Sequence, residues 1–180
     1  MKRTPVFLES SKGESGAICL AMVLGHFDSF PKLNIVKSAC SAGDNEILPE
    51  NLYQTAIAFG FTVKQSSETL EEISIDSPVI VKIKPNKYVL IIKEHKNYYV
   101  VHDTEKGIQR VEKQKLKFSY DHWSLHLTPS DQFKIIKKGN SFIGELTKRI
   151  SPNFKGMLFV LITGMVLLIP AILIPSFNKL

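Results

Sequence analysis

The chain has 180 residues, enough for one domain of ordinary size and an appendage. Hydrophobic residues make up 44% of it and charged residues 22%, which suffices for a folded core. The net charge of +6 is mostly lysine and is spread along the chain. No segment interleaves basic with aromatic residues in a pattern for stacking on bases, so we expect no nucleic-acid partner.

The two cysteines and the N-terminal residues indicate the cellular compartment. Cys19 and Cys40 form no Cys-x-x-Cys pair and no disulfide framework, and both fit a reducing environment. The first residues, Met1 to Pro5, lack the apolar region of a secretory signal. We therefore expect the N-terminal domain to stay in the cytoplasm.

The first half of the chain predicts helices. Apolar residues on every side predict a mostly buried helix from residue 15 to about residue 27, and a short helix at 33–40 precedes a loop. A third helix opens at Pro49, with proline and acid in its first turn and Gly60 as its C′ residue. Residues 68–73 are compatible with one more short helical turn.

After Pro78 the pattern becomes that of strands. Runs of β-branched and aromatic residues separated by polar turns predict strands at the following positions: 79–83, 88–93, 98–101 and 108–111. Residues 123–127 alternate apolar and polar side chains like a final strand. Helices followed by antiparallel strands predict an α+β domain over residues 1–130.

The C-terminal part is different. The uncharged apolar run from Met157 to Ile174 predicts a transmembrane helix at 157–175, because a bilayer core requires about 17–25 apolar residues. Basic residues precede this run and only Lys179 follows it, so a single-pass chain would keep its N-terminal domain in the cytoplasm. Residues 131–156 form a basic linker, in which Phe142, Leu146 and Ile150 predict a short amphipathic helix. It would lie at the membrane surface or serve as a solvated connector.

The segment Glu14-Ser15-Gly16-Ala17-Ile18-Cys19-Leu20-Ala21-Met22 is the most informative of the chain. It resembles the start of the C39 peptidase domain, the papain-like module of bacterial peptide-exporting ABC transporters. There the pattern is Glu-Cys-Gly-x-x-Cys-Leu-Ala-Met, and the first cysteine cleaves the leader from an exported peptide. The resemblance covers roughly residues 5 to 130 in order and spacing, and it implies the papain-like cysteine peptidase fold.

The resemblance assigns a family role to four positions. Ser15 stands in the place of the catalytic cysteine, and Cys19 in that of the second, non-catalytic one. Glu9, six residues before Ser15, stands in the place of the glutamine that stabilises the oxyanion. Lys87, after Asn86, takes the place of the histidine, and Asp103, sixteen residues later, matches the orienting aspartate.

These residue types predict that the chain is not an enzyme. A papain-type mechanism needs a thiolate at a helix N-terminus, a histidine base, an orienting group and an oxyanion donor. The Ser15 hydroxyl lacks such a base, the Glu9 carboxylate would repel an oxyanion, and Lys87 would more naturally pair with Asp103. We therefore expect no catalytic residues, with Ser15, Lys87, Asp103 and Glu9 as degenerate counterparts.

Two other catalytic arrangements are compatible with the sequence. Ser15 and Lys87 would form a Ser–Lys dyad if Lys87 were neutral near pH 7. Cys19 would be a displaced nucleophile, although its apolar neighbours favour a buried structural thiol. His122 and His126 are four residues apart, but on a predicted strand or loop and not on one helical face, so we expect neither a metal site nor a cofactor. The chain has no P-loop segment.

The resemblance implies a function in peptide export. We expect a proteolytically inactive C39-like domain at the bacterial cytoplasmic (inner) membrane, which binds or positions a leader-bearing peptide for an ABC exporter. The alternatives are an active leader peptidase using Ser15 and a structural accessory module of the transporter. Because the family's transporters continue with further helices and an ATPase domain, the chain would be a fragment, a truncated product or an accessory subunit. Its partners would be transporter subunits or the remainder of the same transporter.

Overall fold

The computed structural model describes residues 4–11, 13–40 and 47–137, together with Phe159, Val166 and three residues between them at 162–164. The chain divides into two units, Met1–Gly139 and Asn140–Leu180.

The described residues of the second unit are helical and exposed, and the Thr163 hydroxyl donates a hydrogen bond of 2.8 Å to the carbonyl of Phe159. Within the described parts of the chain, no helix has both the length and the apolar character needed to cross a membrane. Most of the predicted transmembrane helix at 157–175 lies outside the described residues. The predicted amphipathic helix around Leu146 does so entirely.

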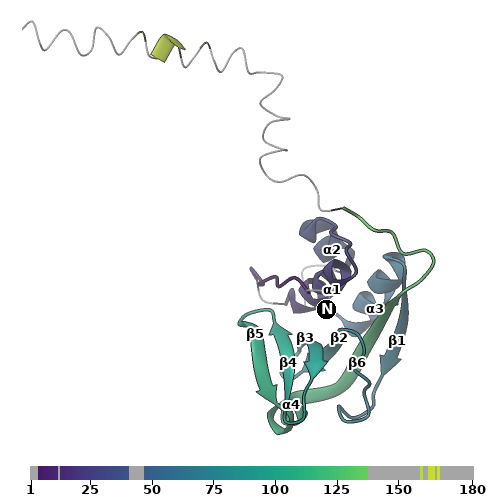
Figure 1. Cartoon of the computed structure of the whole chain (residues 1–180). Helices are drawn as coiled ribbons and strands as arrows, with labels where there is room; N and C mark the ends of the chain where they lie inside the picture. The colour runs from purple at the N-terminus through teal and green to yellow at the C-terminus, as the bar shows by residue number, and fades with distance from the viewer. Residues whose placement is uncertain are drawn as a thin grey trace, which may run out of the picture. The chain divides into compact units, whose positions relative to one another are not determined.

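The first unit starts with three helices and continues with strands (Figure 1). Its elements are α1 Ser15–His26, α2 Leu33–Cys40, α3 Pro49–Ala58, β1 Phe61–Ser66, β2 Val79–Ile83, β3 Lys87–Glu94, β4 Tyr98–Asp103, β5 Gly107–Glu112, α4 Lys113–Ser119 and β6 Tyr120–Pro129. The three predicted helices and five predicted strands are confirmed, whereas β1 and α4 were not predicted. Residues 68–73 form a turn, in which the Glu72 N–H donates to the Thr69 carbonyl, instead of a helical turn.

The strands form one six-stranded antiparallel sheet in the order β1-β6-β2-β3-β4-β5. The last strand, β6, lies between β1 and β2, so that Phe61 pairs with Pro129. From β2 to β5 each strand pairs with the next, and Val89 lies opposite Asp103. The beginning of β3 therefore lies beside the end of β4, which is where the candidate site forms.

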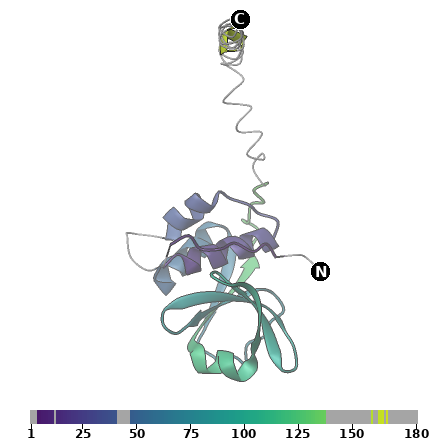
Figure 2. The same cartoon turned by 90° about the vertical axis from the view of Figure 1, so that its left-hand side faces the viewer.

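Both faces of the sheet are covered: α1, α2 and α3 lie on one side of it and α4 on the other (Figure 2). On the first face, α1 packs over Ile80, Leu90 and Leu125. All of α1 from Ser15 to Gly25 is buried, because α2 and α3 contact the sides of the helix that the sheet leaves open. Because α1 is enclosed on every side, its residues are apolar on every side as well.

The turn at Gly60, between α3 and β1, is tied to the segment that follows β6. Gly60 has φ +87°, and its carbonyl accepts a hydrogen bond of 3.0 Å from the Ser130 N–H. The ring of Phe133 packs on Phe61 at 4.8 Å between centroids. Further on, the Ile136 carbonyl accepts from the backbone of the α1–α2 connection. Residues 130–136 therefore pack on the domain.

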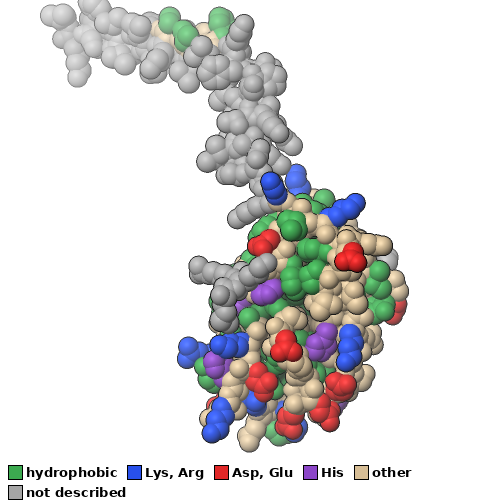
Figure 3. Space-filling view, turned by 45° about the vertical axis from the view of Figure 1, so that its right-hand side comes forward, with side chains coloured by type: hydrophobic (Ala, Val, Ile, Leu, Met, Phe, Trp, Pro, Cys, Tyr) green, Lys and Arg blue, Asp and Glu red, His purple; other side chains and the backbone are tan. Residues whose placement is uncertain are grey.

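Charged side chains are unevenly distributed over the first unit. On the face drawn in Figure 3, acidic side chains gather in the lower half, while lysine and arginine side chains are dispersed. The lysine excess of the chain therefore forms no continuous basic patch on this face.

Candidate active site

Ser15 is the first residue of α1 and is buried, with 4% of its surface exposed. Its hydroxyl oxygen accepts a hydrogen bond of 3.1 Å from the backbone N–H of Tyr88, near the start of β3. The next residue, Gly16, packs so closely that an added Cβ would lie 3.2 Å from the Tyr88 ring. The hydroxyl thus sits at the positive end of a buried helix, pressed against the sheet.

Lys87 and Asp103 form an ion pair beside this helix start. The Lys87 Nζ lies 2.8 Å from Asp103 Oδ1 and 3.0 Å from a carboxylate oxygen of Glu105. The two side chains of the first pair are 19% and 12% exposed. Asp103 Oδ1 also accepts the backbone N–H groups of Glu105 and Lys106, at 2.7 and 3.2 Å. The pairing of Lys87 with Asp103 that the sequence predicts is confirmed.

The pairing keeps both groups charged. Burial lowers the pKa of Lys87, but its hydrogen bonds to Asp103 and Glu105 outweigh burial and raise the pKa above its usual value. Burial raises the pKa of Asp103, but the Lys87 ammonium and two backbone N–H groups outweigh it and lower the pKa. A Ser–Lys dyad requires a neutral lysine, so this environment opposes the dyad at neutral pH.

Glu9 reaches the same corner through Thr104. The Thr104 hydroxyl donates to a carboxylate oxygen of Glu9 at 2.7 Å, and the Glu9 N–H donates to the Thr104 carbonyl at 2.8 Å. Thr104 is fully buried and follows Asp103 directly. The structure therefore brings all four predicted positions, Glu9, Ser15, Lys87 and Asp103, to one corner of the fold.

Cys19, one turn along α1 from Ser15, is a buried free thiol. Burial raises the pKa of Cys19 far above its usual value, and the charges of Asp103 and Glu9 raise it further. A thiolate is therefore strongly disfavoured, which agrees with a structural role.

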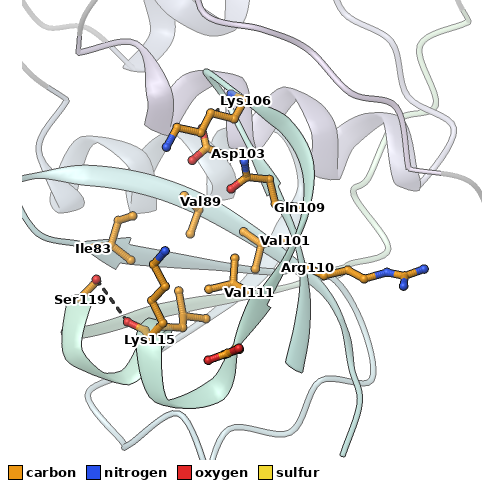
Figure 4. A pocket seen from close by; sticks show the side chains of 12 residues that line it. Ile83, Val89, Val101, Asp103, Lys106, Gln109, Arg110, Val111, Lys115 and Ser119 are labelled. Carbon is orange, nitrogen blue, oxygen red and sulfur yellow. Dashed lines mark hydrogen bonds between the residues drawn. The ribbon is translucent and has the colours of Figure 1, made fainter. Parts of the chain in front are cut away.

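A cavity extends from this corner along the sheet face that α4 covers (Figure 4). It has a volume of about 470 Å³. Its floor is aliphatic and its rim is charged or polar. The floor consists of Ile83, Val89, Val101, Val111 and Leu116, and the rim includes Asp103, Lys106, Gln109, Arg110, Glu112 and Lys115. Asp103 and Lys106 lie at one end of it and Lys115 at the other (Figure 4).

Sequence reasoning missed several members of this site. Glu105 is a second partner of Lys87. The sequence signal for this ion pair was an acidic residue on a turn, two positions after Asp103. Thr104 binds Glu9 across 95 residues of sequence, for which the sequence contains no signal. The groove was missed because α4, which forms one wall of it, was not predicted. Among the described residues, no three His, Cys, Asp or Glu side chains are grouped to hold a metal ion.

Asp103 should make the domain lose stability in acid. Because its pKa is lower in the folded state than the usual value of about 3.9, its contribution to the free energy of unfolding is complete above about pH 3.9. The contribution is lost as the pH falls through the lower folded-state pKa. We expect Asp103→Asn to lower the melting temperature at pH 7 and to flatten its decline below about pH 4.

Thermal unfolding between about pH 2 and pH 7 measures this effect. Asp131→Asn, a change at an exposed residue, is the matched control and should leave the profile unchanged. Parallel profiles for the natural chain and Asp103→Asn would contradict the expectation.

A layer of helices packs on an antiparallel sheet, with a hydroxyl at a buried helix start and an ion pair on the neighbouring strand ends. Comparison with known families shows which class of protein has this arrangement. The chain belongs to the Peptidase C39 family, whose model matches residues 3–132.

The relatives and solved structures agree with this membership. The chain is 23% identical, over 134 residues, to the colicin V secretion/processing ATP-binding protein of Escherichia coli; this covers 74% of the chain but 19% of the relative. The fold is similar to a double glycine motif protease from an AMS/PCAT transporter, solved in complex with the leader peptide, with a TM-score of 0.67 at 22% identity. That match covers 72% of this chain and 94% of the solved one.

A second similar fold is the peptidase domain of Streptococcus ComA, a bifunctional ABC transporter involved in quorum sensing. The TM-score is 0.65 at 14% identity, and the match covers 71% of this chain and all of the solved domain. The described fold thus corresponds to a whole peptidase domain, while the chain spans about a fifth of the curated relative.

The prediction that the chain is not an enzyme is wrong. The family to which the chain belongs is one of peptidases, and a solved domain of the same fold is a double glycine motif protease. That prediction relied on the residue types at positions 9, 15 and 87. The fold keeps these positions together around a helix start, and no described feature shows that the site has lost its activity.

Proposed function

We propose that the chain provides the leader-recognition domain of an ABC-type exporter of peptides or bacteriocins. Membership in the Peptidase C39 family is the observation that carries the proposal. Support comes from the colicin V secretion/processing relative, and from a similar solved domain that is in complex with a leader peptide. The partners would be a leader-bearing peptide and the other parts or subunits of the transporter.

At the site, Ser15, Lys87, Asp103 and Glu9 are the counterparts of the nucleophile, the histidine, the aspartate and the oxyanion glutamine of the family. Their meeting at one corner supports this correspondence, since they come from four separate parts of the chain. The peptide bond that follows the leader would lie at Ser15, where the helix dipole favours negative charge.

The groove beside Asp103 would hold the apolar side chains of the leader. Its aliphatic floor provides the apolar surface that a leader segment would bury, and its volume of about 470 Å³ fits several side chains. Lys106 and Lys115 on the rim balance Asp103 and Glu112, whereas the Arg110 side chain points away from the groove (Figure 4), so the apolar floor would contribute most of the affinity.

Cleavage of the leader by Ser15 is a second candidate function, which family membership favours. In such a reaction the Ser15 oxygen would attack the carbonyl carbon while its proton passes to a base. The C–N bond would then break, the amine of the cargo would leave with that proton, and water would hydrolyse the Ser15 ester. If Lys87 is that base, only the neutral amine is active. Because the pKa of Lys87 is raised, the rate should then increase about tenfold per pH unit until the pH reaches that pKa. A pH–rate profile that levels off near pH 7 would exclude Lys87 as the base.

In this proposal, residues 1–130 are the recognition domain, residues 131–156 the basic linker and residues 157–175 a membrane helix. The uncharged run from Met157 to Ile174 supports the membrane helix, and the basic residues before it support a domain on the cytoplasmic side of a bacterial inner membrane.

Blocking the groove tests where the leader binds. Gln109 lines the groove, whereas its neighbour Ile108 is 63% exposed and its side chain lies on the other face of β5. We expect Gln109→Trp to fill the groove and weaken leader binding about tenfold, with Ile108→Trp as the matched control. Calorimetric titration with a synthetic peptide ending in Gly-Gly provides the affinities. Equal affinities for the two variants would place the leader elsewhere.

A further inference from the structure

The aromatic pair Tyr88–Trp123 lies beside the helix start, on the sheet face opposite the groove. The two rings meet edge to face, with centroids 5.5 Å apart and planes at 78°. The Tyr88 backbone N–H donates to the Ser15 hydroxyl, and the Tyr88 hydroxyl donates to the Ile47 carbonyl at 3.1 Å. A continuous layer of packed groups therefore runs from Ser15 through Tyr88 to Trp123 on β6.

Trp123 has a hydrogen-bond donor for which the described part of the chain supplies no acceptor. The residue is 8% exposed, and its indole Nε1 is a buried nitrogen for which no described residue supplies a partner. Buried polar groups in folded proteins are paired in the great majority of cases, because an unpaired one destabilises the fold. An unpaired indole N–H next to a proposed peptide site is explained if the bound peptide supplies the acceptor.

The surroundings hold the indole in place. Strand β2 lies between β3 and β6, with Lys82 opposite Tyr88, so Lys82 comes between Tyr88 and Trp123. The Lys82 ammonium lies 3.5 Å from a carboxylate oxygen of Asp121, two residues before Trp123. The Tyr88 ring packs edge to face on the indole, so the indole loses little freedom on binding a ligand.

We infer that the indole N–H of Trp123 donates a hydrogen bond to a main-chain carbonyl oxygen of the peptide bound beside Ser15. The inference rests on the proposed function. An extended peptide presents a carbonyl group at every residue, so this contact positions the main chain and does not depend on the side chains of the leader. In this inference Trp123 is a binding residue, and its Nε1, which is buried in the free chain, would become accessible to the carbonyl oxygen when the peptide binds.

The chain contains a single tryptophan, so its indole N–H gives one resonance in a nitrogen-15 correlation spectrum. We expect a panel of synthetic peptides ending in Gly-Gly, titrated into the full chain in detergent, to move this resonance downfield and to slow its exchange with solvent. Saturable shifts of other resonances with the indole unmoved would overturn the inference and leave leader binding intact. The absence of any saturable shift would overturn both the proposed function and the inference.

Isosteric replacement tests the same hydrogen bond energetically. In a tryptophan auxotroph, benzothienylalanine would replace only Trp123 and would remove the N–H while keeping the two fused rings. We expect about fivefold weaker binding of the peptide, the effect of one neutral hydrogen bond, and an equal or higher melting temperature of the free chain. Fluorotryptophan, which keeps the N–H, is the matched control. Equal affinities of the two analogues would overturn the inference.

Discussion

The triple variant Ser15→Cys, Lys87→His and Glu9→Gln is expected to cleave a double-glycine peptide about a thousandfold faster than the natural chain. A thiol at the start of α1 is more acidic than a hydroxyl, and the helix dipole favours the thiolate. An imidazole at position 87 would take the proton near pH 7, whereas the paired Lys87 ammonium stays charged. An amide at position 9 would add a hydrogen-bond donor for the oxyanion.

Asp103 should be essential to that gain. It lies 2.8 Å from the Lys87 nitrogen, so it is placed to orient an imidazole at position 87. The triple variant with Asp103→Asn added should lose most of the acceleration, and melting curves of each variant confirm that it is folded. An unchanged rate in the folded triple variant would show that these positions are not the counterparts of the family's catalytic residues.

Gly60→Ala is expected to lower the free energy of unfolding by about 3 kcal/mol. Gly60 has φ +87°, and an added Cβ would lie 2.7 Å from the Phe133 Cα and 2.8 Å from the Gln132 carbonyl oxygen. These are backbone atoms, so they cannot move aside as the end of a side chain can. The variant therefore combines a strained backbone with displacement of the segment after β6, and urea unfolding measures the loss.

Gly107→Ala is the matched control for this prediction. Gly107 has φ +75°, but an added Cβ would meet no heavy atom within 4 Å. The control therefore contains the backbone strain without the clash, and we expect a loss of about 1 kcal/mol. Equal losses at the two glycines would show that the contact between Gly60 and residues 132–133 contributes nothing to stability.

The buried parts of this fold could be predicted because their sequences admit few alternatives. The run from Ala17 to Leu24 is apolar on every side, and only a helix enclosed by other elements satisfies it. The strands β2 and β3 are long β-branched runs, and both are buried at their centres. The ion pair between Lys87 and Asp103 could be predicted from the family pattern, because that pattern places the two residues at the ends of neighbouring strands.

The missed elements depend on partners that are distant in sequence. β1 is buried at its two ends and mostly exposed between them, and it becomes a strand by pairing with β6, more than fifty residues later. α4 has seven residues, several of them lysines, and Leu116 is its buried anchor. A helix so short has no periodicity to detect. The contact of Glu9 with Thr104 likewise arises only when the N-terminal segment lies along the folded sheet.

The residue types at the site were overinterpreted because the contacts of these residues also involve partners that are distant in sequence. A serine, a lysine and a glutamate at three family positions predicted a lost activity, because each was judged by its own chemistry. The structure places Glu9 on Thr104 and Lys87 between Asp103 and Glu105, so the carboxylate at position 9 is held by a hydroxyl and the lysine by two acids. What a residue does at this site depends on such contacts, which sequence spacing does not contain.

Calorimetric titration of the full chain in detergent with double-glycine leader peptides tests the central claim most directly. Recognition of a leader by this domain predicts saturable binding with one peptide per chain, and no binding of the same cargo peptide without its leader. The absence of saturable binding for every leader, with a chain that is folded by its melting curve, would contradict the account.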